Sequence, residues 1–391
     1  MRAANSVFSG LGTTIFTVMS TLAAEHGAIN LGQGFPDDEG PDDVRAAAAS
    51  AIMDGPNQYP PMMGLPALRQ AVAAANARFY GLDVDWRTEV MVTSGATEAL
   101  SDCLMALLNP GDEAIIIEPA YDCYKPIIEA AGARVVPVSL EPPHWSLPLE
   151  RLEAAFSDRT KLIVVNTPMN PTGKVFTRRE LEAIAALLVR HDAYAVCDEV
   201  YEHLVFSGHR HVPLMTLPGM RERTLRVGSA GKTFSLTGWK VGYVTAPAPL
   251  MATVAKAHQF VTFTTAPALQ SAVAYGLSKP DDYFAGLAAS LESKRDLLTG
   301  GLRHAGLDVL PADGTYFISV DFRSLGFKGT DEEFCRDITV KAKVAAIPLS
   351  AFYTDSAAAP RHLARFCFCK QDAILTEASA RLLAYAKGGG V

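Results

Sequence analysis

The sequence has no apolar run long enough to cross a membrane and no concentration of charge of one sign. Spanning a bilayer takes about 20 consecutive apolar residues, and the moderately apolar segment Leu11–Ala24 is interrupted repeatedly by threonine and serine. We therefore expect a helix of the mature protein there rather than a signal peptide. The formal net charge is −7, with both signs interspersed, so no basic field attracts nucleic acid or anionic lipid. These absences predict neither a membrane anchor nor a nucleic-acid partner.

Cysteine is scarce, and its spacing does not suggest a metal site. The six cysteines form no Cys-x-x-Cys pair. Cys367 and Cys369 are two residues apart and would lie on one face of a strand, which is a poor start for a tetrahedral site. We interpret the cysteines as buried free thiols of a cytoplasmic protein and predict no metal.

The sequence does contain enough material for a large core. Its 391 residues are 49% hydrophobic and 20% charged, an ordinary balance for a globular protein with two domains. In the middle of the chain, strand-like runs rich in β-branched residues alternate with helical spacing, which predicts a mostly parallel sheet with helices on both faces. The expected strands are Val90–Thr93, Ala114–Glu118, Arg134–Val138, Lys161–Asn166, Ala193–Asp198 and Thr224–Gly228. The expected helices are Ala96–Leu108, Tyr124–Ala131 and Arg178–His191.

The last third of the sequence differs from the middle. A long helical pattern covers Pro267–Thr299, and short strands separated by helices follow it. We expect a smaller α+β domain, with strands at Asp308–Leu310, Tyr316–Asp321, Val344–Ile347 and Arg365–Cys369. The predicted division is an amino-terminal arm with part of the small domain (1–40), a large domain (41–275) and a small domain (276–391).

Ligands of parallel sheets bind at the carboxyl ends of the strands, and two of the predicted strands are followed by suggestive segments. Ser94–Leu100 is a turn of small residues that opens a helix, where free N–H groups and the helix dipole favour a phosphate. A plainly capped helix is the alternative. Asn166–Lys174 contains two prolines and a glycine, so an irregular loop could direct the Asn170 amide at a ligand. A surface turn explains it equally well.

Two further segments carry ionisable groups. Asp198 ends an apolar strand, where a carboxylate is costly unless a cation such as a protonated pyridine nitrogen pairs with it. Capping of the next helix is the alternative. Lys232 lies in Gly228–Tyr243 among small and apolar neighbours, which favour a neutral, nucleophilic amine. The spacing does not match a nucleotide-binding P-loop, and a flexible loop with incidental lysines is the remaining alternative.

The order of these segments resembles the class I/II aminotransferases of pyridoxal phosphate (PLP) fold type I, especially the kynurenine/glutamine/methionine aminotransferase group. The resemblance runs from Ile29–Pro36 to Arg365–Phe368, and its specific motifs are Asn170–Phe176 and Ser229–Phe234. It implies an α/β fold with a smaller α+β domain. It also implies PLP as cofactor, amino acids and 2-oxo acids as substrates, and a cytoplasmic homodimer whose subunits share the site.

The resemblance also implies roles for individual residues. Lys232 matches the lysine that binds the cofactor covalently, Asp198 the partner of the pyridine nitrogen, and Tyr201 a catalytic group at O3′. The other implied cofactor contacts are Asn170 at O3′, Tyr121 on the ring, Gly95, Ala96, Thr97, Ser229 and Lys240 at the phosphate, and Tyr59 from the neighbouring subunit. The implied substrate contacts are Gly34, Asn170 and Arg365, whose planar fork suits a carboxylate.

These assignments predict ping-pong transfer of an amino group to a 2-oxo acid. A cysteine-conjugate β-lyase and an N-succinyl-diaminopimelate aminotransferase remain alternatives on the same fold. A transcription factor with an aminotransferase-like body would need a DNA-binding domain, and no basic segment precedes Ser6. Aromatic amino acids, methionine, glutamine and kynurenine all stay open as donors. Candidate walls of an apolar pocket are Phe16, Tyr59, Met62, Phe263, Tyr316 and Phe352.

Overall fold

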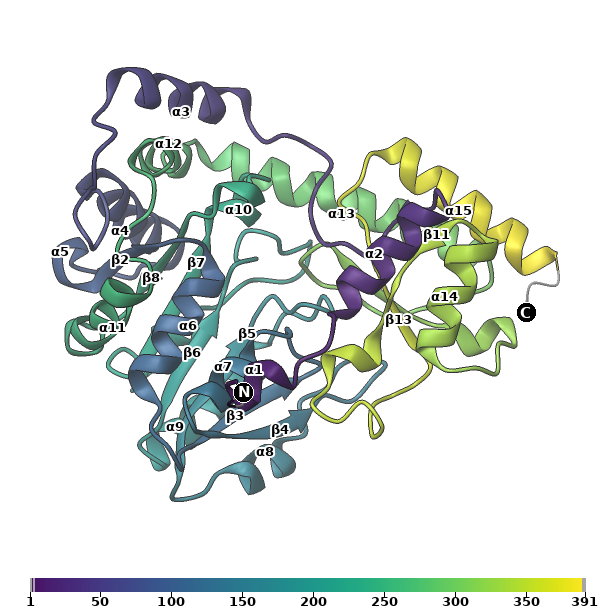
Figure 1. The fold of residues 1–391 in the computed structure, drawn as a ribbon, viewed down its shortest axis with the longest axis horizontal. Helices are drawn as coiled ribbons and strands as arrows, with labels where there is room; N and C mark the ends of the chain where they lie inside the picture. The colour runs from purple at the N-terminus through teal and green to yellow at the C-terminus, as the bar shows by residue number, and fades with distance from the viewer. Residues whose placement is uncertain (1, 3, 389–391) are drawn as a thin grey trace.

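A seven-stranded sheet forms the centre of the larger part of the molecule (Figure 1). The computed structural model describes residue 2 and residues 4–388. In spatial order the strands are β2 (Val90–Thr93), β8 (Gly242–Thr245), β7 (Thr224–Ser229), β6 (Tyr194–Asp198), β5 (Thr160–Asn166), β3 (Glu113–Glu118) and β4 (Arg134–Ser139). Only β8 is antiparallel to its neighbours in this sheet, so the predicted mostly parallel sheet is confirmed.

The strands of this sheet are buried on both faces. Every residue of β3 and of β7 is buried, and continuous burial requires cover on each side of a sheet. Helix α6 (Ala96–Leu107) packs against β2, β6, β7 and β8, and α11 (Ala248–Val261) packs against α6. Helix α9 (Arg178–Arg190) starts with a capping box of Thr177 and Glu180 and buries Leu181, Ile184 and Leu188.

A second region surrounds a four-stranded antiparallel sheet. Its strands are, in order, β12 (Ile347–Pro348), β13 (Leu363–Cys367), β10 (Phe317–Asp321) and β9 (Asp308–Val309). Beside it, β1 (Ile29–Asn30) pairs in parallel with β11 (Val344–Ala345), so the amino-terminal arm joins this region. The helices α2 (Ile15–Glu25), α14 (Asp331–Lys341) and α15 (Asp372–Lys387) pack around these strands. The smaller α+β region is thus present.

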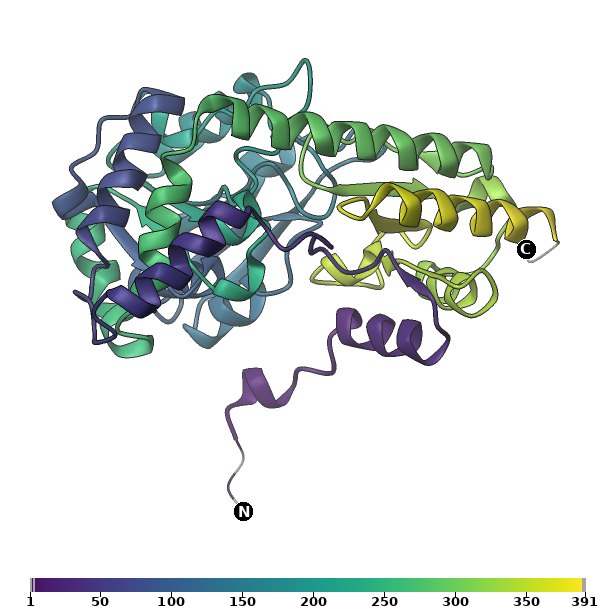
Figure 2. The same ribbon diagram turned by 90° about the horizontal axis from the view of Figure 1, so that it is seen from above.

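One long helix connects the two regions. Helix α13 (Asp281–His304) runs from the larger region to the smaller one in Figure 2. The predicted helical stretch Pro267–Thr299 is therefore divided, because α12 (Pro267–Leu277) ends before Pro280, which caps α13. Proline cannot donate the backbone bond that a continuous helix requires. The predicted boundary after residue 275 falls inside α12, and the domain division stays a prediction.

The large region and the amino-terminal arm contain further helices. They are α1 (Ser6–Ser9), α3 (Asp42–Asp54), α4 (Pro66–Tyr80), α5 (Trp86–Glu89), α7 (Tyr124–Ala130), α8 (Leu149–Ala155) and α10 (Ala230–Thr233). Among the helices of the described residues, none has both the length and the apolar character needed to cross a membrane.

Candidate active site

A cavity of about 360 Å³ lies where three parallel strands end. Its wall contains Asn166, Asp198 and Ser229, the last residues of β5, β6 and β7. The predicted site residues that line it are Gly34, Gly95, Ala96, Thr97, Tyr121, Asn170, Asp198, Tyr201, Ser229, Lys232, Lys240 and Arg365. The structure therefore brings together every predicted site residue except Tyr59.

Lys232 lies in the short helix α10, directly after β7, so its position is set by the central sheet. Its Nζ donates to Tyr316 Oη at 3.1 Å, and Tyr316 Oη in turn donates to the Gly34 carbonyl at 2.8 Å. Burial lowers the pKa of Lys232, although Cys369 and Asp198 oppose this effect. A buried amine with a lowered pKa is more readily neutral, as a nucleophile or a base must be.

Asp198 is a buried carboxylate at the end of β6. Its Oδ2 accepts a hydrogen bond of 2.5 Å from Tyr124, and its Oδ1 accepts one of 3.4 Å from the Val200 amide. Burial raises its pKa, and the Tyr124 hydrogen bond opposes the rise. Within the described part of the chain no lysine, arginine or histidine forms an ion pair with it. Lys232 attracts its charge from a distance, but its ionised form lacks the direct ion-pair partner that a buried carboxylate needs.

The start of α6 and Lys240 together form a positive corner of the cavity. Gly95 caps α6 with φ 82°, and the helix begins at Ala96, so the amides of its first turn have no intrahelical acceptor. A Cβ at Gly95 would lie 3.2 Å from Lys240 Nζ and 3.1 Å from its Cε. Glycine therefore lets the ammonium approach the helix start. An ammonium beside a helix amino terminus is suited to a phosphate.

Arg365 and Asn170 form the opposite wall. Arg365 donates to Asn170 Oδ1 at 2.8 Å and to the Gly32 carbonyl at 2.6 Å, while its buried Nε has no hydrogen-bond partner. Its guanidinium lies 4.2 Å from the ring centroid of Phe317, 5.0 Å from that of Phe352 and 5.4 Å from that of Phe16. Burial lowers its pKa. A fully buried guanidinium that contacts only neutral groups is prepared for an anionic ligand.

The loop that carries Gly34 approaches this wall closely. A Cβ at Gly34 would lie 2.7 Å from the Phe317 ring, so only glycine fits here without movement. The two predicted tyrosines lie between these groups. Tyr201 packs edge-on against Tyr316, with centroids 5.3 Å apart, and burial raises the pKa of both Tyr201 and Tyr121.

Tyr59 lies apart from this cavity. Its side chain is 84% exposed, and its ring packs edge-on against Phe263 at 5.7 Å. Of the other proposed pocket walls, Phe16 lines the cavity, but Met62 and Phe263 do not. Tyr316 and Phe352 are not among its lining residues either.

Tyr124 forms a hydrogen bond with Asp198, and Tyr316 forms one with Lys232. The sequence predicted neither contact. Tyr124 binds Asp198 across 74 positions of sequence, and Tyr316 binds Lys232 across 84. Tyr316 had been assigned only as a possible apolar wall. No local sequence pattern identifies contacts between residues so far apart in the chain. The spacing of Tyr121 and Tyr124 indicates only that these two tyrosines lie near the same turn.

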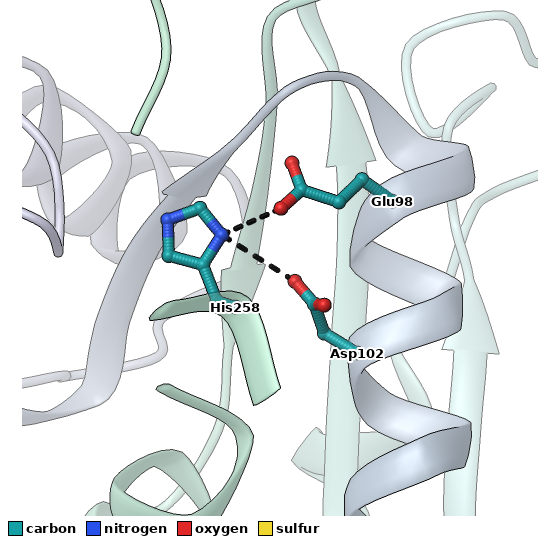
Figure 3. Close-up of side chains that lie close together, drawn as sticks. All are labelled: Glu98, Asp102 and His258. Atoms are coloured by element: carbon teal, nitrogen blue, oxygen red, sulfur yellow. Dashed lines mark hydrogen bonds and ion pairs between the residues drawn. The ribbon is translucent and has the colours of Figure 1, made fainter. Parts of the chain in front are cut away.

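A buried ionic cluster of Glu98, Asp102 and His258 lies between the first two turns of α6 and helix α11 (Figure 3). His258 Nδ1, on α11, lies 2.6 Å from Glu98 Oε1 and 3.5 Å from Asp102 Oδ2. Its Nε2 bonds to the Met62 carbonyl at 3.1 Å, and Glu98 also accepts from the Ser94 amide. Burial alone would lower the pKa of His258, but the two carboxylates outweigh it and raise that pKa to about 9. The cluster therefore ties the loop before α6 to α11.

Comparisons with known proteins agree with this geometry. The model of the family "Aminotransferase class I and II" matches residues 26–382. A probable N-succinyldiaminopimelate aminotransferase of Mycobacterium tuberculosis is 45% identical over 95% of each chain, and a structure of that enzyme from this organism superposes with a TM-score of 0.95 over 98% of this chain and 100% of that one.

Two other relatives act on different donors according to their names. The methionine aminotransferase of Escherichia coli is 42% identical, with 95% of this chain and 96% of that one covered. A structure of an Escherichia coli protein with this function has a TM-score of 0.94, with 98% and 99% of the two chains covered. The mouse kynurenine–oxoglutarate transaminase 3 is 41% identical, with 94% of this chain and 87% of that one covered.

Proposed function

This chain belongs to the class I and II aminotransferases and is a PLP-dependent transaminase of fold type I, and from that membership we propose how its residues divide the work. One observation carries the assignment. A buried carboxylate without a cation, a buried amine with a lowered pKa and a positive helix start all line a single cavity. PLP has a basic ring nitrogen, an aldehyde and a phosphate, so the residues fit this cofactor.

In this proposal Lys232 binds the cofactor aldehyde, and Asp198 holds the ring nitrogen in its protonated form. Gly95, Ala96, Thr97, Ser229 and Lys240 hold the phosphate, and Tyr121 covers the ring. Asn170 and Tyr201 donate to O3′. When bound, PLP accepts the electron pair that is left when the Cα–H bond of the amino acid breaks.

The chain itself supplies the proton transfers and the orientation of the substrate. Once an amino acid has displaced it, the neutral Lys232 amine would take the proton from Cα and deliver it to C4′ of the cofactor. The Tyr316 hydroxyl accepts a hydrogen bond from Lys232 Nζ and so keeps Nζ in place. The same hydroxyl donates a hydrogen bond to the Gly34 carbonyl. Arg365 binds the α-carboxylate, aided by Asn170 and the backbone at Gly34. Release of a 2-oxo acid and entry of a second one give ping-pong kinetics.

We propose an L-amino acid with an uncharged side chain of the methionine, aromatic, glutamine or kynurenine type as the donor. The cations among the described residues that line the cavity are Lys232, Lys240 and Arg365, and all three have assigned partners. Phe16 and Phe35 add apolar surface to the wall. This lining supports a neutral side chain.

N-succinyl-diaminopimelate remains a second candidate substrate, because a relative that is 45% identical over 95% of the chain has that name. Its distal carboxylates would require cations beyond the three that line the cavity. A cysteine-conjugate β-lyase activity would use the same residues until the leaving group departs.

We also propose that the active unit is a cytoplasmic two-fold dimer. Tyr59 and the nearby Phe263 are exposed and apolar, and Phe260 is 84% exposed, which favours a partner surface. A two-fold axis would let one subunit offer Tyr59 to the phosphate of the other. The free cysteines favour a reducing compartment.

A panel of amino donors and 2-oxo acids tests the proposed substrates. Methionine and an aromatic amino acid should be used with kcat/KM values at least about tenfold above those for aspartate and N-succinyl-diaminopimelate. A preference for N-succinyl-diaminopimelate would favour the second candidate. Pyruvate release from a cysteine conjugate, without a 2-oxo acid acceptor, would reveal the lyase.

A further inference from the structure

Two cysteines in the small region lie in direct contact. Cys367 is the last residue of β13, and Cys369 lies two residues later, beyond the strand. The sequence had suggested that the strand continues to Cys369, but the chain leaves it at Cys367. Because of this bend the two Sγ atoms lie 3.1 Å apart, and both are buried. A disulfide bond has an S–S distance of about 2.0 Å, so a movement of about 1 Å would connect them.

Cys369 borders a second, smaller cavity on the far side of the active-site lysine. This cavity has a volume of about 100 Å³, and Lys232, Tyr316 and Lys370 also line it. Its size admits a small solute such as a peroxide, since a water molecule occupies about 30 Å³ of liquid volume. The cavity wall thus offers an approach to the Cys369 thiol despite its burial.

The backbone around the thiol pair holds parts of the proposed substrate site. The Cys367 amide donates to the Leu31 carbonyl at 2.7 Å, and the Phe368 amide donates to the Tyr316 carbonyl at 2.9 Å. Lys370 Nζ holds the Phe35 carbonyl at 3.1 Å. Arg365 lies on the same strand, two residues before Cys367. A movement of this segment would therefore shift the arm around Gly34 and the guanidinium of Arg365.

We propose that Cys367 and Cys369 form a reversible dithiol–disulfide pair that hydrogen peroxide oxidises and that weakens donor binding when oxidised. The Cys369 sulfur attacks one peroxide oxygen, the O–O bond breaks, and water leaves as the sulfur becomes a sulfenic acid. The Cys367 sulfur then attacks that sulfur and expels its hydroxyl group as a second water. The two thiols lose two electrons and two protons, the peroxide is reduced, and an external dithiol restores the pair.

The charges near the pair are compatible with this chemistry. Burial opposes ionisation of the Cys367 thiol, but the hydrogen bond from Cys369 and the cations of Lys370 and Arg365 outweigh it and lower the pKa of Cys367. A thiolate is the species that attacks a sulfenic acid or a disulfide. Burial raises the pKa of Cys369, but the hydrogen bond between the two sulfurs lets the Cys367 thiolate accept the Cys369 proton as Cys369 attacks the peroxide. Cys367 then acts as the resolving thiol.

Peptide mapping of the holoenzyme tests the bond itself. Trypsin cleaves after Arg365 and Lys370, so one short peptide, residues 366–370, contains both cysteines. After treatment with hydrogen peroxide this peptide should be about 2 Da lighter and should resist alkylation until it is reduced. Recovery of the peptide with two free thiols under conditions that oxidise glutathione overturns the proposal.

Steady-state kinetics test whether oxidation weakens donor binding. This effect rests on the proposed role of Arg365 in binding the α-carboxylate. Oxidation should raise KM for methionine and for an aromatic donor by about fivefold or more, and a dithiol should reverse the change. Cys369→Ser and Cys367→Ser should keep the basal activity and lose the peroxide response. Cys335→Ser is the matched control, because Cys335 is buried in the same region and should keep the response.

The two readouts separate the possible failures. A disulfide in residues 366–370 with unchanged KM overturns the coupling to donor binding. If untreated enzyme shows no transaminase activity while the disulfide still forms, the proposed function fails and the thiol chemistry stands. If the serine variants do not fold, the peptide map of the unmodified enzyme decides alone.

Discussion

Arg365 illustrates how the surroundings of a residue, rather than its type, determine its role. Its guanidinium is enclosed by the rings of Phe16, Phe317 and Phe352 and by neutral oxygen atoms. A surface arginine would find water and counterions, but a buried one has its charge only partly satisfied. An incoming carboxylate can therefore bind with much of the desolvation cost already met by the fold.

Replacing Arg365 with lysine keeps the charge and removes the fork of N–H donors. We expect kcat/KM for methionine and for an aromatic donor to fall at least about tenfold, because charged hydrogen bonds contribute about 1.5–3 kcal/mol each. The visible absorbance of the cofactor should remain, since Arg365 is not assigned to PLP. Near-normal kcat/KM for both donors would mean that the α-carboxylate binds elsewhere.

Tyr316→Phe removes one hydroxyl between Lys232 and the Gly34 carbonyl. We expect kcat to fall about tenfold while the cofactor stays bound, because the amine loses the contact that orients it. The pH profile of kcat should shift as well, since the environment of Lys232 changes. Tyr385→Phe removes a hydroxyl bonded to Asp337 in the small region and is the matched control. A variant with unchanged kcat and an unchanged pH profile would assign Tyr316 a structural role only.

At this scale the sequence predicted residues that lie in motifs, such as Asn170, Asp198 and Lys232, and the structure brings them into one cavity. It did not predict the roles of Tyr124 and Tyr316, which depend on contacts across 74 and 84 positions. Pairs of that kind form only when the strands that carry them have packed.

Among the elements, helix α6 connects the cofactor pocket to the rest of the fold. Its first turn faces the cavity and carries Glu98, which contacts His258 on α11 together with Asp102 from the next turn (Figure 3). Burial raises the pKa of Asp102 to about 6, with the nearby Glu98 adding to the rise and His258 opposing it. The interactions of His258 with the two carboxylates therefore stabilise the loop before α6, which borders the proposed phosphate site.

The cluster predicts a pH dependence of stability. The folded pKa of His258, about 9, lies above the ordinary value of 6.5 for histidine, so its contribution is full below about pH 6.5 and is lost as the pH rises towards about 9. Over this window the contribution amounts to about 3 kcal/mol, since one pKa unit corresponds to 1.36 kcal/mol. The melting temperature of the holoenzyme should fall across the same window at fixed protein and cofactor concentrations.

His258→Gln should flatten that dependence and lower stability near pH 6. His144→Gln is the control, because His144 is exposed in a loop. If the His258 variant keeps the slope of the wild-type enzyme, another group is responsible for it.

The sequence predicted six of the seven strands of the central sheet, because runs of β-branched residues in a buried parallel strand have few alternatives. It did not predict the antiparallel strand β8. The strand Val90–Thr93 has the predicted bounds, and α6 ends one residue before the predicted end. Helices α3 and α4 were not assigned, since their alanine-rich faces give weak periodicity. The long helical stretch was predicted without its break at Pro280.

At the scale of the whole molecule, we propose an active site that two copies of the chain complete together. Tyr59 is 84% exposed and lies outside the cavity, and the amino-terminal arm adds exposed Phe8 and Leu11. A second copy would cover these apolar side chains and add Tyr59 to the phosphate corner.

Sedimentation of active enzyme tests this arrangement. We expect a species of about twice the 41.8 kDa chain mass. Tyr59→Phe should weaken cofactor binding by about 1 kcal/mol through the loss of one hydrogen bond, with little effect on the dimer. Tyr80→Phe changes a half-buried tyrosine that does not line the cavity and should leave cofactor binding unchanged. An active monomer at working concentration would contradict the shared site.

The central claim is that Lys232 binds PLP and moves the substrate proton. Borohydride reduction of the holoenzyme should remove its visible absorbance and fix the cofactor covalently, and peptide mapping should then find the pyridoxyl mass on Lys232. Lys232→Ala should carry no fixed cofactor and should lose transamination by several orders of magnitude. The pyridoxyl mass on Lys174 or Lys240 in the unmodified enzyme, or on no lysine at all, would contradict the account.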